Sequence, residues 1–131
     1  RRIWSLKDNP ELRFMALKDF DQDMITLIKR GSVLRYAPTQ LYVSDSQKVL
    51  IFGRGRFIFA LNFSPVHSFT DFEFCAPSGE YRIALNTDAK NYDGFGRIDE
   101  SVHHFTSRKD GGDKLSLYLP SRSAIVLEKI R

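Results

Sequence analysis

The spacing of apolar residues changes at Gly31, and this change constrains the fold more than any other feature of the sequence. Before Gly31 the apolar residues recur every three or four positions, as on one face of a helix. After it they form short or alternating runs, as in half-buried strands. We therefore expect a helical lead-in followed by a β domain.

The helical lead-in is predicted over residues 10–30, as one or two helices. Asn9 can cap its start, and Pro10 suits its first position. Gly31, directly after two basic residues, is a typical stop signal, and Lys18-Asp19 is a candidate break between two helices. The apolar stripe of this segment consists of Leu17, Phe20, Met24, Leu27 and Ile28.

About eight runs after Gly31 have the length and pattern of strands. They are 41–43, 49–52, 57–63, 69–75, 81–86, 102–106, 115–119 and 123–128. Residues that favour turns separate them, and no pattern of helical length lies between them. Parallel strands need long crossovers, so the sequence predicts an antiparallel sandwich of seven or eight strands.

Composition limits the class of protein. The apolar stretches end after a handful of residues, far short of the ~20 that span a bilayer, so we expect no membrane segment. The single cysteine, Cys75, rules out an intramolecular disulfide framework, suits a reducing cytoplasm and is expected to be a small core residue. The chain begins at Arg1 without an initiator Met and is interpreted as a fragment.

Residue types that carry chemistry do not form a catalytic or metal-binding pattern. His103 and His104 are adjacent on a predicted strand, so they should point to opposite faces and cannot grip one ion. No Gly-x-Ser-x-Gly elbow frames a serine, and Cys75 lies in a strand pattern. We therefore expect no catalytic residue, no metal and no cofactor in this chain.

Two segments partly match functional motifs, a calcium-binding loop and a nucleic-acid-binding surface. Residues 89–100 match a calcium loop at four positions, but Ala89 occupies the first ligand position and Arg97 the ninth, so a turn-rich loop is favoured. The segment 53–56, G-R-G-R, lies beside Phe57 and could mimic a nucleic-acid surface. A hairpin turn explains its glycines equally well, and we expect no nucleic-acid partner.

Several segments, in order and with similar spacing, resemble one known family. They are L-N-F-S-P at 61–65, S-F-T-D-F at 68–72, G-E-Y-R-I-A-L-N-T-D at 79–88, G-F-G-R-I-D at 94–99, L-S-L-Y-L-P-S-R-S-A-I-V-L at 115–127, R-R-I-W at 1–4 and F-D-Q-D-M at 20–24. The first five resemble the C-terminal all-β domain of 1,4-α-glucan (glycogen) branching enzymes of the α-amylase superfamily. The last two resemble elements at the end of that family's catalytic barrel.

The resemblance implies a mainly β fold: an antiparallel β-sandwich of the α-amylase C-terminal domain type, Greek-key, preceded by one or two short α-helices. Residues 1–31 would be a helical remnant of the end of the catalytic (β/α)8 barrel, and residues 32–131 the C-terminal β-sandwich domain. The implied partners are that barrel and α-glucan (glycogen), in the cytoplasm, with no cofactor.

The implied activity is transglycosylation: cleavage of an α-1,4-glucan and re-attachment of the piece through an α-1,6 link. The family uses an Asp nucleophile and a Glu acid/base on barrel strands, which would lie upstream of this chain. We therefore expect the chain alone to be inactive. Its acids are interpreted as caps, turns or interface pairs, among them Asp21, Asp23, Asp71 and Asp88.

The sequence departs from the family pattern at four positions. Ser64 replaces His, Asp93 replaces the first Gly of a pair, Glu100 replaces His, and Ile3 replaces Gln. These changes should leave the fold intact but alter any glucan or barrel contact made there.

The longest irregular stretch, 87–101, is the candidate functional loop. Tyr92, Phe95 and Arg97 are its candidate substrate-binding or barrel-interface residues, because rings stack on sugars and a guanidinium donates to hydroxyls or carboxylates. In the alternative the loop is held by its own packing, with Phe95 buried and Arg97 paired to Asp99 or Glu100. We expect a buried Phe95 and an interfacial Arg97.

A free-standing, non-catalytic carbohydrate- or protein-binding module is the alternative function. The helical stripe at Phe20, Met24 and Ile28 discriminates between the two. A barrel remnant should leave an apolar face partly uncovered, whereas a complete module should bury it.

Overall fold

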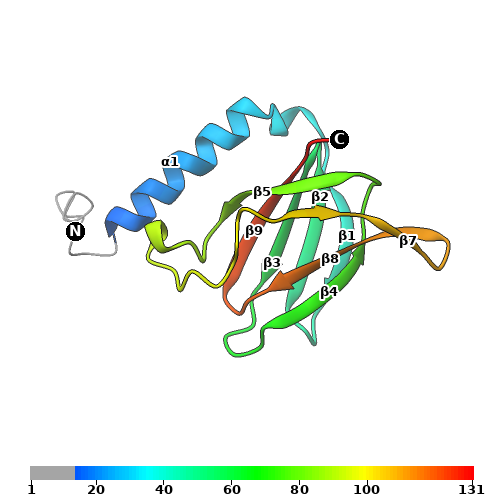
Figure 1. Cartoon of the computed structure of the whole chain (residues 1–131). Coiled ribbons are helices and arrows are strands. Elements are labelled where there is room, and N and C mark those ends of the chain that lie inside the picture. Colours follow the sequence, from blue (N-terminus) through cyan, green and yellow to red (C-terminus); the bar gives the residue numbers. More distant parts are fainter. Residues whose placement is uncertain (1–13) are drawn as a thin grey trace.

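The computed structural model describes residues 14–131 (Figure 1), so the predicted helix start at Asn9 and Pro10, and the 1–4 motif with Ile3, lie outside the described residues. One helix, α1 (Phe14–Arg30), continues through Lys18-Asp19, and the candidate break there is wrong. Neither residue removes a backbone hydrogen bond as proline would, so the helix is not interrupted. Gly31 donates its N–H to Leu27 O at 3.0 Å, and the chain leaves the helix there.

Nine strands follow in the described part of the chain. They are β1 (Thr39–Ser44), β2 (Val49–Arg54), β3 (Phe57–Asn62), β4 (Phe69–Cys75), β5 (Glu80–Asn86), β6 (His103–Phe105), β7 (Ser107–Lys109), β8 (Gly112–Leu119) and β9 (Ser123–Lys129). They form a six-stranded sheet in the order β1-β2-β3-β9-β5-β6 and a three-stranded sheet in the order β4-β8-β7 (Figure 1). Every pairing is antiparallel, which confirms the predicted mainly β, antiparallel architecture.

The predicted strand at 102–106 corresponds to β6, whereas β7, which follows it, lies outside every predicted run. β6 pairs with β5 in the larger sheet, whereas β7 pairs with β8 in the smaller sheet. Thr106 lies between them and bonds Gly79, with its N–H donating to Gly79 O at 3.0 Å. Residues 107–109 carry no apolar side chain and are all exposed, so no alternation indicated a strand there.

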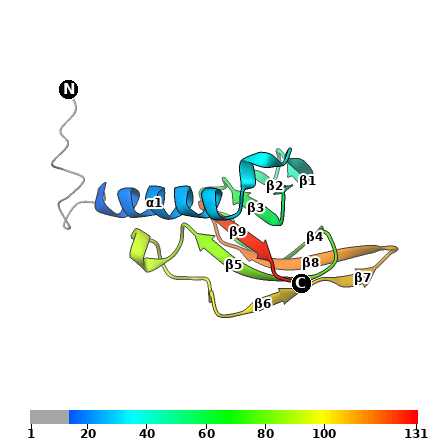
Figure 2. The ribbon, with the colours of Figure 1, turned by 90° about the horizontal axis from the view of Figure 1, so that it is seen from above.

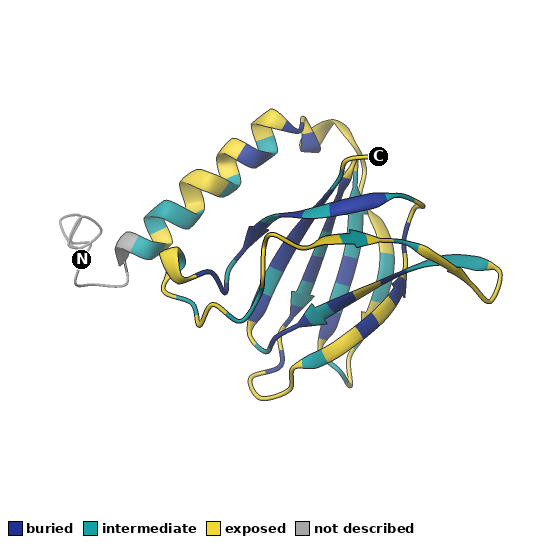
Figure 3. Cartoon of the chain, in the orientation of Figure 1, coloured by how far each residue is buried: buried dark blue, intermediate teal, exposed yellow. Residues whose placement is uncertain are grey.

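The main core lies between the two sheets and follows the alternation of the strands (Figure 3). β4 shows the pattern: Phe72 and Phe74 point inward, whereas Glu73 and Cys75 point outward. Cys75 is exposed, so its predicted place in the core is wrong, because it sits on the solvent side of a strand whose phenylalanines set the inward side.

A second apolar cluster lies between α1 and the outer face of the six-stranded sheet. Figure 2 shows the position of the helix relative to the strands. Its buried members are Leu27, Val33, Phe57, Leu85 and Val126. The stripe residues Phe20, Met24 and Ile28 pack against this cluster and stay partly exposed. Leu17 and Ile25 are more than half exposed. The helix is thus fixed to the sandwich by one side and leaves other apolar side chains uncovered.

Candidate functional site

The loop at 87–101 joins β5 to β6, and hydrogen bonds to its first residues hold its backbone. A 3-10 turn, η3 (Lys90–Tyr92), follows Ala89 and ends at Asp93, which has a left-handed φ of 65°. The N–H of Gly96 donates to Asp88 O at 2.7 Å. A Cβ on Gly94 would lie 2.3 Å from the carbonyl carbon of Asp88, so only glycine fits there.

Arg97 is bound to Asp88, which is buried. Its Nη2 lies 2.8 Å from Asp88 Oδ1, and its backbone N–H donates to Oδ2 at 2.8 Å. Burial alone would raise the pKa of Asp88, but the hydrogen bonds from Arg97 outweigh it and hold that pKa below its ordinary value. Nη2 also donates to Ser121 O at 2.9 Å, which ties the loop to the turn between β8 and β9.

These contacts correct the expected partners of Arg97. Asp99 accepts hydrogen bonds from the N–H and hydroxyl of Ser101, and Glu100 accepts one from Asn86 Nδ2 at 3.4 Å. Arg97 is an internal anchor of the loop and is about one quarter exposed, so the structure does not present it as an open interfacial group. Asp88 is a turn and pairing residue, as predicted.

Phe95 is 78% exposed, so its predicted burial is wrong. The residues on both sides of it are bound to or packed on Asp88, and this backbone path leaves the ring outside. The guanidinium carbon of Arg97 lies 5.0 Å from the centre of the ring. Because hydrogen bonds to Asp88 and Ser121 hold Arg97 in place, its contact with Phe95 fixes the position of this exposed ring.

Tyr92 faces α1 and lies apart from the pair formed by Phe95 and Arg97. Its hydroxyl donates to Asp23 Oδ2, and its ring is perpendicular to the ring of Phe20, with 5.2 Å between centroids. Burial, with the carboxylate of Asp23 second, raises the pKa of Tyr92 to about 12. The three candidates therefore do not share one exposed side.

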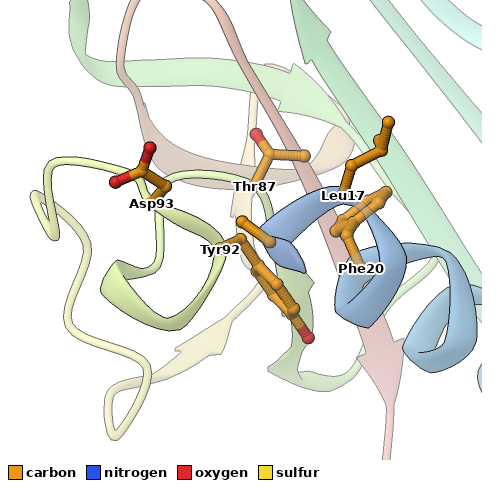
Figure 4. Close-up of a pocket in the computed structure, with 6 residues that line it drawn as sticks. Leu17, Phe20, Thr87, Tyr92 and Asp93 are labelled. Atoms are coloured by element: carbon orange, nitrogen blue, oxygen red, sulfur yellow. The ribbon is translucent and has the colours of Figure 1, made fainter. Parts of the chain in front are cut away.

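A cavity of about 370 Å³ lies where α1 meets η3 (Figure 4). Its lining is mostly apolar and consists of Ala16, Leu17, Phe20, Thr87, Tyr92 and Asp93. A second hollow, of about 390 Å³, shares Thr87 and extends to the exposed ring of Phe63. Apolar walls with a few polar groups suit a sugar face or a protein surface.

The remaining candidates for chemistry are structural. His103 is exposed and its Nδ1 lies 2.6 Å from Glu80 Oε2, whereas His104 is partly buried, and burial lowers its pKa. Within residues 14–131 no three His, Cys, Asp or Glu side chains could hold a metal ion together. In the same range no helix is long and apolar enough to cross a membrane.

Two positions that depart from the family pattern have clear local roles. The Ser64 hydroxyl accepts the N–H of His67 at 3.0 Å in the turn after β3. Asn62, two residues earlier, is buried, and its Oδ1 accepts a hydrogen bond from the Ser64 N–H at 2.9 Å. Asp93 adopts a left-handed conformation that glycine, the family residue, tolerates more readily. Ser64 and Asp93 therefore each belong to a turn of this domain.

Sequence reasoning missed a charged cluster on the outer face of the six-stranded sheet. Glu128 of β9 is buried, with 7% of its side chain exposed, and accepts hydrogen bonds from three arginines. Arg56 Nε donates at 2.8 Å, Arg82 Nη2 at 2.6 Å, and Arg30 through two nitrogens at 3.1 and 3.2 Å. Burial alone would raise the pKa of Glu128, but the arginines lower it to about 2. The sequence offered one sign of this cluster: Glu128 is an acidic residue at the end of the otherwise mostly apolar run 123–128.

The fold is a mainly β domain with one helix, and comparison with known families gives the class. The family described as "Alpha amylase, C-terminal all-beta domain" matches residues 42–130, and the chain belongs to this family. The predicted resemblance is thereby confirmed.

Curated relatives extend the comparison to nearly the whole chain. The chain is 36% identical over 134 residues to the 1,4-alpha-glucan-branching enzyme of Saccharomyces cerevisiae, covering 97% of this chain and 19% of that protein. It is 34% identical over 138 residues to the enzyme of the same name from Dictyostelium discoideum, covering 99% and 20%. It is 39% identical over 111 residues to the chloroplastic/amyloplastic enzyme of Oryza sativa subsp. japonica, covering 82% and 13%. The chain is homologous to the C-terminal regions of these enzymes and spans about a fifth of the length of the first two.

Proposed function

We propose that this chain is the C-terminal part of a 1,4-α-glucan branching enzyme of glycogen biosynthesis in the cytoplasm. The observation that carries the proposal is the similarity to branching enzymes over 97% or more of the chain, together with the family match. The resemblance of the segment 61–65 to the family, apart from Ser64, supports it, and Asn62 of that segment holds the turn after β3.

The chemistry of the parent enzyme is assigned to residues outside this chain. A retaining branching reaction needs a carboxylate nucleophile to form a glycosyl intermediate and a carboxylic acid to protonate the leaving oxygen; a sugar 6-hydroxyl then attacks the intermediate. The acids described above serve other purposes: Asp88 binds Arg97, Asp23 accepts from Tyr92, and Glu128 binds three arginines. None of them is offered as a catalytic group.

The role proposed for this chain is to support the catalytic barrel. Residues 1–31 would belong to the end of that barrel and 32–131 to the sandwich, with α1 as the shared element. Supporting this, α1 buries Leu27 against the sheet but leaves Leu17 and Ile25 more than half exposed. Exposed apolar side chains on an otherwise packed helix mark a surface that another protein layer can cover.

Contact with α-glucan is a second candidate role, favoured by one observation. Phe95 presents an exposed ring on an anchored guanidinium, and such a ring offers a flat apolar face to a pyranose. Tyr92 and Arg97 would then position the loop instead of touching the sugar, because both are engaged within the domain.

Substitution of Phe95→Ala in the full-length enzyme tests both roles. Phe105→Ala is a matched control, because Phe105 is also exposed but lies on β6. If Phe95 touches glucan, the variant loses glucan affinity at unchanged melting temperature; if it touches the barrel, the melting temperature falls instead. Unchanged affinity, stability and turnover would remove Phe95 from both roles.

A further inference from the structure

Three arginines surround Glu128 on the outer face of the larger sheet. Strand pairing places Phe57 opposite Glu128, and Glu128 opposite Arg82. Directly paired residues share a face of the sheet, so these side chains stand side by side. Arg30, the last residue of α1, and Arg56, in the turn before β3, also reach Glu128.

The cluster carries more positive charge than its internal pairing uses. Three guanidinium groups, which stay protonated at any ordinary pH, face one carboxylate. Within residues 14–131 no other carboxylate contacts Arg30, Arg56 or Arg82. Two positive charges therefore remain uncompensated within a few ångströms of each other. Arg30 alone would be enough to attach α1 to Glu128. The attachment of the helix therefore does not explain why three arginines pair with this one carboxylate.

The same arginines keep both donors and access to solvent. Their side chains are 44%, 46% and 41% exposed for Arg30, Arg56 and Arg82. Each guanidinium has five N–H donors, yet Arg56 bonds Glu128 through Nε alone and Arg82 through Nη2 alone. Paired N–H groups that are left over suit the oxygens of a tetrahedral oxyanion.

We propose that Arg30, Arg56 and Arg82 form a binding site for a dianionic phosphate group, with Glu128 holding the three guanidiniums together. A dianion neutralises the excess charge of the cluster. The phosphate could be inorganic phosphate or a monoester carried on a sugar, because both present the same oxygens. This site is separate from the loop at 87–101 and does not depend on the proposed function.

Calorimetric titration of the chain with inorganic phosphate, at low and constant ionic strength, tests the site. We expect saturable binding that Arg56→Gln and Arg82→Gln each weaken about tenfold, because each removes charge-assisted hydrogen bonds. Either variant leaves Glu128 two arginine partners, so the fold should persist, as circular dichroism can verify. Arg108→Gln is the control, since Arg108 is exposed and pairs with Asp113 elsewhere. Its affinity should equal that of the parent chain.

Glu128→Gln distinguishes a binding site from a purely structural ion-pair network. Gln keeps an oxygen that accepts hydrogen bonds from the guanidiniums but removes the negative charge that repels a dianion, so phosphate should bind more tightly to this variant. A second titration uses glucose 6-phosphate. If the chain binds both glucose 6-phosphate and inorganic phosphate, the ligand is a sugar phosphate ester; if it binds inorganic phosphate alone, the ligand is the free ion. The proposal is overturned if neither compound binds saturably, or if the affinity is unchanged in both the Arg56 and the Arg82 variants.

Discussion

Replacing Glu128 by Gln should destabilise the chain, because three arginines would lose their counter-charge. The Glu128 side chain is 7% exposed, so solvent screens it less than it screens the arginines, which are 41% to 46% exposed. The pKa of Glu128 is lowered from 4.5 to about 2. At about 1.4 kcal/mol per pKa unit, this difference corresponds to about 3 kcal/mol of stability at neutral pH.

The pH dependence of that difference follows from the direction of the shift. The folded-state pKa lies below the unfolded-state value, so the unfolded chain binds the extra proton first as the pH falls. The contribution of Glu128 is therefore complete above pH 4.5 and is lost as the pH falls from there to about 2. Urea unfolding of both proteins, followed by circular dichroism across this range, measures the loss.

Glu73→Gln is the matched control for this experiment. Glu73 also forms an ion pair, with Lys109 Nζ at 2.7 Å, but both side chains are exposed. Its replacement should leave the unfolding midpoint unchanged. The reasoning is refuted if Glu128→Gln unfolds within about 0.5 kcal/mol of the parent chain at neutral pH, the range of ordinary surface substitutions. A difference that persists unchanged at the acid end would also refute it.

The remaining predictions concern the loop at 87–101 and the activity of the chain. Arg97→Ala should lower the free energy of unfolding by about 2–4 kcal/mol, because it leaves buried Asp88 without its guanidinium; chemical denaturation checks this, with exposed Arg122→Ala as the control. Gly94→Ala should cost about 2–3 kcal/mol in the same assay, because its Cβ would meet the Asp88 backbone at 2.3 Å; Gly112→Ala, where nothing lies within 4 Å of the added atom, should cost far less. Tyr92→Phe should cost about 1 kcal/mol, because it removes the hydrogen bond to Asp23 and leaves the ring contact with Phe20 in place; an equal melting temperature would contradict this. The purified chain should form no branched or shortened product from amylose in an iodine and chain-length assay, and measurable conversion would overturn the assignment of catalysis to residues outside it.

The strands could be predicted because their signals are local. Alternation places Phe72 and Phe74 on one side of β4, and turn residues end each run within a few positions. The short strand β7 at 107–109 could not be predicted, because its residues are all polar and it is defined by its pairing with β8. The exposure of Cys75 could have been predicted, because the same alternation places it opposite the two phenylalanines.

The candidate site was predictable in its position but not in its arrangement. The length and composition of 87–101 indicated the loop, whereas the partner of Arg97 depends on a backbone path that brings residue 97 back to Asp88. Residue type alone suggested burial for Phe95, and the same path leaves its ring exposed. The arginines around Glu128 come from positions 46 to 98 residues away along the chain, and no periodicity connects them.

The central claim is that this chain is one part of a branching enzyme whose catalytic groups lie outside it. The sequence of the full-length transcript upstream of the Arg1 codon tests this most directly. We predict an open reading frame that continues into a (β/α)8 barrel, with an aspartate nucleophile and a glutamate acid/base at the carboxyl ends of its strands. A start codon directly before Arg1, or an upstream region encoding an unrelated domain, would contradict the account.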